Sequence, residues 1–140
     1  MLETFKLMPA EGFILLALNS LLAKAFMSVY FRFFELKALV TPGEGTKTVL
    51  DNRNDKYYKF VSATQLNESE WFGFMGPLLI FMHINSIVSG PAVVFMTVGN
   101  IAYFWGSAVM NHLIPRAMGA TLRYVGVSMA MYYLWTAKWK

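Results

Sequence analysis

A short polar segment, residues 65–71 (QLNESEW), carries the side chains most able to bind a ligand. On a helix, Asn67, Glu70 and Trp71 share one face, which brings an amide, a carboxylate and an indole within reach of one bound molecule. A carboxylate at this position can accept a hydrogen bond from an ammonium group, or pair with Arg32 or Lys37 further back in the chain.

The same segment has a second interpretation that involves no ligand. If it is the entrance of a helix in the headgroup region of a membrane, Glu68 and Glu70 are exposed to water and favour the helix N-terminus. Acidic residues are common in the first turn of helices. Composition alone favours this interpretation.

A second candidate group repeats at spacings of three and four, and it comprises Asn100, Tyr103, Ser107 and Asn111. Small and polar residues on one face are the usual means by which membrane helices pack against each other. The alternative is contact with a ligand. Tyr103 is the strongest candidate for that role, because a phenol can donate a hydrogen bond to a thiolate or an anionic oxygen.

The cations of the second half have no acidic residue near them in the sequence, since no Asp or Glu occurs from Trp71 to Lys140. Arg116 is expected to be an anchor whose charged end reaches the membrane interface. Arg123 lies deeper. It must pair across helices, bind an anion or lie near an interface.

Composition excludes several classes of protein. The chain is 56% hydrophobic and only 14% charged, which is typical of an integral membrane protein. It has no cysteine and two histidines without ligand spacing, so we expect no metal site. The net charge of +4 is not gathered on one periodic face, so we expect no nucleic-acid partner.

Four segments are long and apolar enough to be helices that cross about 30 Å of hydrocarbon. We expect an all-α membrane protein with a single domain over residues 1–140, an antiparallel bundle of four transmembrane helices, and a polar loop at 41–57. The short stretch before Pro91 forces two of the helices antiparallel. The expected spans are 12–40, 58–88, 91–114 and 120–137.

Two of these segments resemble motifs of the MAPEG family, the membrane-associated proteins in eicosanoid and glutathione metabolism. Residues 65–72 (QLNESEWF) resemble its second-helix signature, in which an Asn is followed by a Glu three residues on and then by an aromatic pair. Residues 102–106 (AYFWG) are similar to the third-helix segment of the leukotriene synthase branch. The resemblance covers nearly the whole chain.

The resemblance implies a four-helix bundle that assembles as a homotrimer, with glutathione bound between neighbouring protomers. Glu70 would meet the glutamyl amine, and Arg32 would stand for the basic residue at the end of the first span. The residues that match the family's glutathione contacts are Arg32, Gln65, Asn67, Glu70, Trp71 and Tyr103.

Three departures from the family pattern concern the chemistry. Ala63 stands where the family has an arginine, and Ser107 where it has a tyrosine. The arginine that lowers the pKa of the thiol in catalytic members aligns with Ile114 or His112. Because a free thiol is mostly protonated at neutral pH, catalysis requires that Arg116 or Arg123 substitute for it.

Two hypotheses follow. The chain is an enzyme, a glutathione transferase or peroxidase that uses Tyr103 and Arg116 on lipophilic electrophiles. Alternatively, it is a non-catalytic structural or lipid-binding subunit of a larger membrane assembly that has kept the fold.

Overall fold

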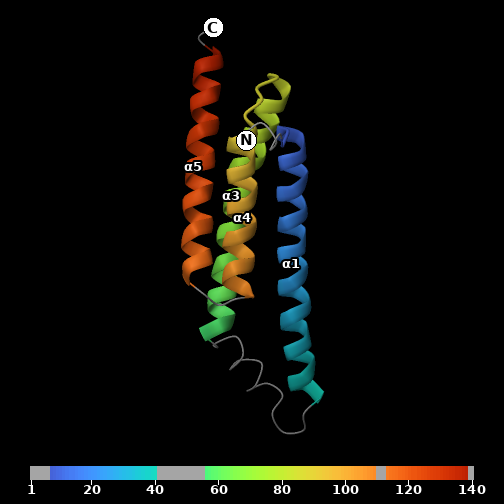
Figure 1. Cartoon of the computed structure of the whole chain (residues 1–140). Helices are drawn as coiled ribbons and strands as arrows, with labels where there is room; N and C mark the ends of the chain where they lie inside the picture. The colour runs from blue at the N-terminus through green and yellow to red at the C-terminus, as the bar shows by residue number, and fades with distance from the viewer. Residues whose placement is uncertain (1–6, 41–55, 110–112, 139–140) are drawn as a thin grey trace.

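The computed structural model describes residues 7–40, 56–109 and 113–138, with the side chains of 31, 33–40, 113 and 138 not described. It confirms the all-α fold class. The described residues form four helices, each antiparallel to the next (Figure 1): α1 Pro9–Val40, α3 Lys56–Ile84, α4 Gly90–Ala108 and α5 Leu113–Lys138.

The shortest helix, α4, contacts all three of the others, while α1 packs mainly against α3. Helix α4 packs along α5 over nearly its whole length, whereas α3 and α5 touch only briefly. Helices α1 and α5 therefore lie on opposite sides of the α3–α4 pair (Figure 1). A polar side chain on α4 can reach three helices at once.

The start of α1 has local signals that fix it. Pro9 is the first helical residue, where its missing N–H costs nothing. Two residues on, the Glu11 carboxylate accepts a hydrogen bond of 2.9 Å from the backbone N–H of Met8. This contact satisfies one of the donors that every helix N-terminus leaves without a partner inside the helix.

The tight turn between α3 and α4 is built by backbone hydrogen bonds. The N–H of Ser86 donates to the carbonyl of His83, and the N–H of Ile87 donates to the carbonyl of Met82. These two bonds form a Schellman motif, which places Ser86 in the left-handed region with a φ of 54°. The turn reverses the chain and sets α4 beside α3.

The helix bounds differ from the expected spans mainly around Pro115. We expected Pro115 to end the third span near Ile114, but α4 ends at Ala108 and α5 begins at Leu113. Pro115 therefore lies in the first turn of α5, where proline is tolerated because the N–H groups there have no partner inside the helix. The expected loop 41–57 overlaps α3, and its residues 41–55 lie outside the described part, as does Asn111.

A tyrosine links the start of α3 to the end of α4. The hydroxyl of Tyr57, at the start of α3, donates a hydrogen bond to the carbonyl of Ala108, the last residue of α4. Burial raises the pKa of the Tyr57 phenol, and the neighbouring Tyr30 adds to this effect. The bond satisfies a carbonyl that the end of α4 would otherwise leave without a partner.

Glycines let α4 and α5 approach closely. A Cβ atom added to Gly99 would lie 2.7 Å from the backbone nitrogen of Arg123. A Cβ added to Gly119 would overlap the backbone of Tyr103. Helix packing, the alternative to ligand contact in the third span, is thus present in the structure and involves a small residue of that span, Gly99.

The interior has an apolar layer at each end and a polar layer between them. On α1, the polar residues Asn19 and Ser20 lie between buried Leu16 and Ala23. The same order recurs on two other helices, with Glu68 between Val61 and Met75 on α3, and Asn100 between Met96 and Phe104 on α4. The polar layer is the candidate site.

Large apolar side chains are exposed along the outer sides of α1, α3 and α5, whereas on α4 only Val98 is of this kind. Of the described helices, only α1 contains a stretch, Pro9–Tyr30, that is long and apolar enough to cross a membrane by length and composition. The other three were also expected to qualify. They are interrupted by polar residues, which on α3 form the run from Gln65 to Glu70.

Candidate functional site

The centre of the polar layer is a buried carboxylate, that of Glu68. It is fully buried and accepts three hydrogen bonds, from the Asn19 amide at 3.2 Å, the Ser20 hydroxyl at 3.2 Å and the Asn100 amide at 3.1 Å. The interpretation in which Glu68 is exposed to water is therefore wrong. Because α3 begins at Lys56, Glu68 lies three turns inside the helix rather than at its entrance.

The second buried charge is Arg123 of α5, which is only 2% exposed. Its two terminal nitrogens donate to the side-chain oxygens of Asn100 at 3.1 Å and Asn67 at 3.0 Å. The guanidinium also lies over two aromatic rings, 4.7 Å from the Trp71 centroid and 3.8 Å from the Tyr103 centroid. Of the three placements considered for Arg123, the structure has pairing across helices, with amides and rings as partners.

Asn100 joins the two charges. Its amide nitrogen donates to Glu68, and its amide oxygen accepts from Arg123. A buried charge without partners is strongly destabilising, so an amide that serves both ions stabilises each of them. Through these contacts the network joins α1, α3, α4 and α5.

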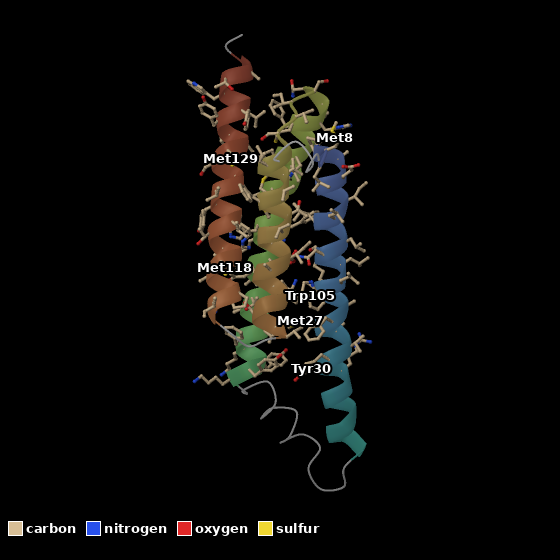
Figure 2. All side chains as sticks on the ribbon, in the orientation of Figure 1. Met8, Met27, Tyr30, Trp105, Met118 and Met129 are labelled. Carbon is tan, nitrogen blue, oxygen red and sulfur yellow. The ribbon has the colours of Figure 1, made fainter. Side chains whose placement is uncertain are left out.

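An indole extends the network on the α1 side. The Trp105 side chain lies on the side of α4 that faces α1 (Figure 2), and its ring nitrogen donates to the side-chain oxygen of Asn19 at 2.9 Å. This bond fixes which end of the Asn19 amide faces Glu68, since the other end must then donate. Asn19 thus has both of its polar groups paired.

Tyr103 lies between two cations. Its ring centroid is 3.8 Å from the guanidinium carbon of Arg123 and 5.6 Å from that of Arg116. Arg116 also lies 5.1 Å from the centroid of Phe60, and it is half-buried. The contacts described for Arg116 are thus two ring faces, and the guanidinium groups of both arginines lie near the one phenol of the third-span motif.

A shallow pocket of about 160 Å³ opens on the outer side of α3 beside this cluster. Glu70, Trp71 and Phe74 line it. The Trp71 ring has Arg123 at one contact and the exposed Tyr124 of α5 at another, with the two aromatic centroids 4.8 Å apart. Glu70 is exposed, Trp71 is half-buried and Arg123 is buried, so these three side chains follow one another from the surface to the interior.

The structure brings together some of the residues that match the family pattern and not others. Asn67, Trp71 and Tyr103 all contact Arg123, and Glu70 lies next to them. Gln65 donates instead to Ser69 on its own helix, at 2.7 Å. Arg32 is exposed near the end of α1, and no contact described for it reaches the cluster.

Sequence reasoning missed the part of the network formed by Asn19, Ser20, Glu68 and Trp105. The signal for Glu68 was present in its spacing, because the buried residues Val61, Glu68, Met75 and Met82 repeat every seven positions. This period places the carboxylate on the core side of α3. Trp105 had no such signal, since tryptophans also occur at membrane interfaces.

The described residues hold no cluster of three or more His, Asp or Glu side chains that could bind a metal. Comparison with protein-family models, with curated proteins and with solved structures finds no match to this chain.

Proposed function

We propose that this chain is a MAPEG-like membrane protein that binds glutathione and activates its thiol beside Tyr103. The observation that carries the proposal is the position of the Tyr103 ring between the guanidinium groups of Arg116 and Arg123. The family's usual arginine positions are occupied here by other residues. These two arginines supply positive charge at the same phenol.

Besides this charge, the chemistry requires the thiol to reach Tyr103, whose side chain is only 5% exposed. A free thiol has a pKa of about 8.5, and a neighbouring cation favours the thiolate. The Tyr103 hydroxyl would donate a hydrogen bond to the sulfur, while the exposed Glu70 carboxylate would hold the glutamyl ammonium group. The thiolate would then attack an electrophilic carbon of an apolar substrate and displace its leaving group.

The proposal includes a location in the membrane with four spans. It is supported by the apolar side chains exposed on the outer sides of α1, α3 and α5, since large exposed apolar surfaces mark contact with lipid or protein. The polar layer that interrupts α3, α4 and α5 faces inward. Polar residues in membrane helices are expected to face the interior of the bundle.

The proposal also includes a homotrimer with a site between protomers. The pocket at Glu70 is shallow, and at about 160 Å³ it is smaller than the 300–1,000 Å³ usual for a ligand site. A second copy would supply the missing wall. On α3 the exposed residues Leu66, Glu70, Phe74, Pro77 and Phe81 follow a helical spacing of three and four, which would form the contact.

One observation favours the non-catalytic alternative. Arg123 already has two amide partners and is almost fully buried, so its charge is used in holding the bundle together. On this view the chain is a structural or lipid-binding subunit of a larger membrane assembly.

Two measurements on purified protein in detergent distinguish the enzyme from the non-catalytic subunit. Calorimetry measures glutathione binding, and a generic aromatic electrophile is used to measure turnover. We expect Glu70→Ala and Arg116→Met each to weaken binding, because each removes one charge contact. Tyr103→Phe should lower turnover more than binding. Lys59→Met is the matched control, since it removes an exposed cation from α3 outside the cluster. Absence of both binding and turnover in the wild type would leave the structural role.

A further inference from the structure

The phenol of Tyr103 is separated from the surface by two other side chains. Tyr103 is only 5% exposed, and Arg123 is only 2% exposed. The half-buried Trp71 ring lines the shallow pocket at Glu70 on the outer side of α3, and the Arg123 guanidinium carbon lies 4.7 Å from the centroid of the same ring. A thiol held at this pocket is therefore separated from Tyr103 by Trp71 and Arg123.

Packing closes two other sides of the phenol. Towards α5, a Cβ atom on Gly119 would overlap the backbone of Tyr103, so α4 and α5 leave no space between their backbones. Towards α1, the interior is occupied by the hydrogen bonds that Glu68 accepts from Asn19 and Asn100. Helices α3 and α5, by contrast, touch only briefly. The seam between α3 and α5 is therefore the side of the bundle with the least packing to displace.

Two aromatic rings cover this seam. The centroids of Trp71 on α3 and Tyr124 on α5 lie 4.8 Å apart, with an angle of 90° between the ring planes. Edge-to-face pairs of this kind are favourable. Tyr124 is 62% exposed, so it covers Trp71 from outside, while Arg123 contacts Trp71 from inside. The Trp71 ring can turn out of the seam only if its contact with Tyr124 breaks.

We infer that reactants reach Tyr103 through the seam between α3 and α5, and that Tyr124 controls this access through its contact with Trp71. The inference rests on the proposed function, in which the thiol binds beside Tyr103, and Tyr124 is not among the residues that match the family's glutathione contacts. The hydrogen bonds that hold Arg123 go to Asn67 and Asn100. They do not involve Trp71, so the charge stays in place when the ring turns.

The test uses a cysteine placed behind the two rings, because the chain has no cysteine of its own. Tyr103→Cys supplies one thiol, which methyl methanethiosulfonate converts to a methyl disulfide with release of methanesulfinate. Mass spectrometry of the protein in detergent gives the rate. We expect Tyr124→Ala to raise this rate about two- to tenfold, the range that corresponds to the strength of one aromatic pair. Val125→Ala is the matched control, because it shortens the next exposed side chain of α5.

Several outcomes would overturn the inference. An unchanged rate in Tyr124→Ala, or an equal rise in Val125→Ala, would show that the contact between the two rings does not limit access. A rise in Phe60→Leu alone would place the entrance at the loop end, where Arg116 lies over the rings of Phe60 and Tyr103.

A second reporter covers the case in which Tyr103→Cys does not fold. Ser107→Cys is nearly isosteric, and Ser107 is fully buried one turn further along the same side of α4. Its labelling should also be faster with Tyr124→Ala, and an unchanged rate would overturn the inference. Labelling requires no glutathione. A wild type that shows no glutathione binding in calorimetry would therefore contradict the proposed function, whereas the labelling rates decide the access route.

Discussion

At the residue scale, the molecule stabilises two opposite buried charges through an amide that lies between them. Glu68 and Arg123 both bond to Asn100, which presents its donor to one and its acceptor to the other. Either charge alone would be costly in the interior. The Asn100 amide must therefore keep this one orientation to stabilise both Glu68 and Arg123.

Replacing Glu68 with Gln tests how much this carboxylate contributes. We expect Glu68→Gln to lower the free energy of unfolding by about 1–3 kcal/mol, because a buried acceptor of three hydrogen bonds becomes in part a donor that faces other donors. Thermal unfolding in detergent, followed by circular dichroism, measures the change.

Glu70→Gln is the control, two residues along the same helix but exposed, and it should stay within about 0.5 kcal/mol of the wild type. Equal unfolding midpoints for the two variants would show that the buried network contributes nothing to stability.

The sequence predicts the candidate residues better than their environments. Asn67, Trp71 and Tyr103 could be chosen from their types and spacing, and all three meet at Arg123. The environment of Glu68 was mistaken because the acidic run was assigned to the headgroup region, although the expected span from residue 58 already placed Glu68 well inside the helix. Whether Glu68 or Glu70 is buried depends on which face of α3 is turned to the core. Val61 and Met75, each seven residues from Glu68, indicate that Glu68 lies on that face.

At the element scale, the closest packing is between α4 and α5. Gly99 on one helix and Gly119 on the other leave no room for a Cβ atom between the backbones. Arg123, one turn beyond Gly119, reaches Asn67 and Asn100 from this position. The close packing of α4 against α5 therefore positions the Arg123 guanidinium group.

Gly119→Ala should destabilise the protein by about 1–3 kcal/mol, because its Cβ would overlap the backbone of Tyr103 and force the two helices apart. The midpoint of thermal unfolding in detergent measures this. Gly73→Ala is the matched control, since nothing lies within 4 Å of a Cβ at that position.

The control should be neutral or stabilising by about 0.5–1 kcal/mol, the usual gain on replacing a glycine in the middle of a helix. If Gly119→Ala behaved in the same way, the close approach of α4 and α5 would be excluded.

The helices themselves could be predicted from apolar length and from Pro91, but the bounds near Pro115 could not. Proline ends one helix or begins the next with equal ease at a boundary. The choice here depends on tertiary packing, because a Cβ on Gly106 would overlap the Pro115 side chain across the two helices.

At the scale of the whole molecule, the described helices bury a polar layer and expose many large apolar side chains. This is the reverse of the usual arrangement in a soluble protein, although single exposed apolar residues are normal there. The composition predicts a membrane protein, and the membrane location stays a prediction. Because the buried polar layer lowers the apolar content of three helices, the same composition does not identify each of them as a span.

The proposed membrane location and trimer make a joint prediction. The chain should remain with vesicles after alkaline extraction, and its mass in mild detergent should be that of three copies. Phe74→Ala should dissociate the trimer, because it removes an exposed apolar side chain from the outer face of α3.

Ile14→Ala provides the comparison, because Ile14 is similarly exposed but lies on α1. Light scattering or native mass spectrometry reports the mass of each variant. A monomer in the wild type, or equal dissociation by both variants, would contradict the assignment of α3 to the contact.

The enclosure of Arg123 has a consequence for the order in which the bundle is assembled. Its partners Asn67, Trp71, Asn100 and Tyr103 all belong to helices that are synthesised before α5. The last of the described helices therefore carries into the interior a cation whose partners all lie on helices synthesised earlier. Truncation before α5 would leave Asn67 and the Asn100 oxygen without their donor, so a chain that stops short should be recognised as incomplete by the unpaired polar groups it exposes.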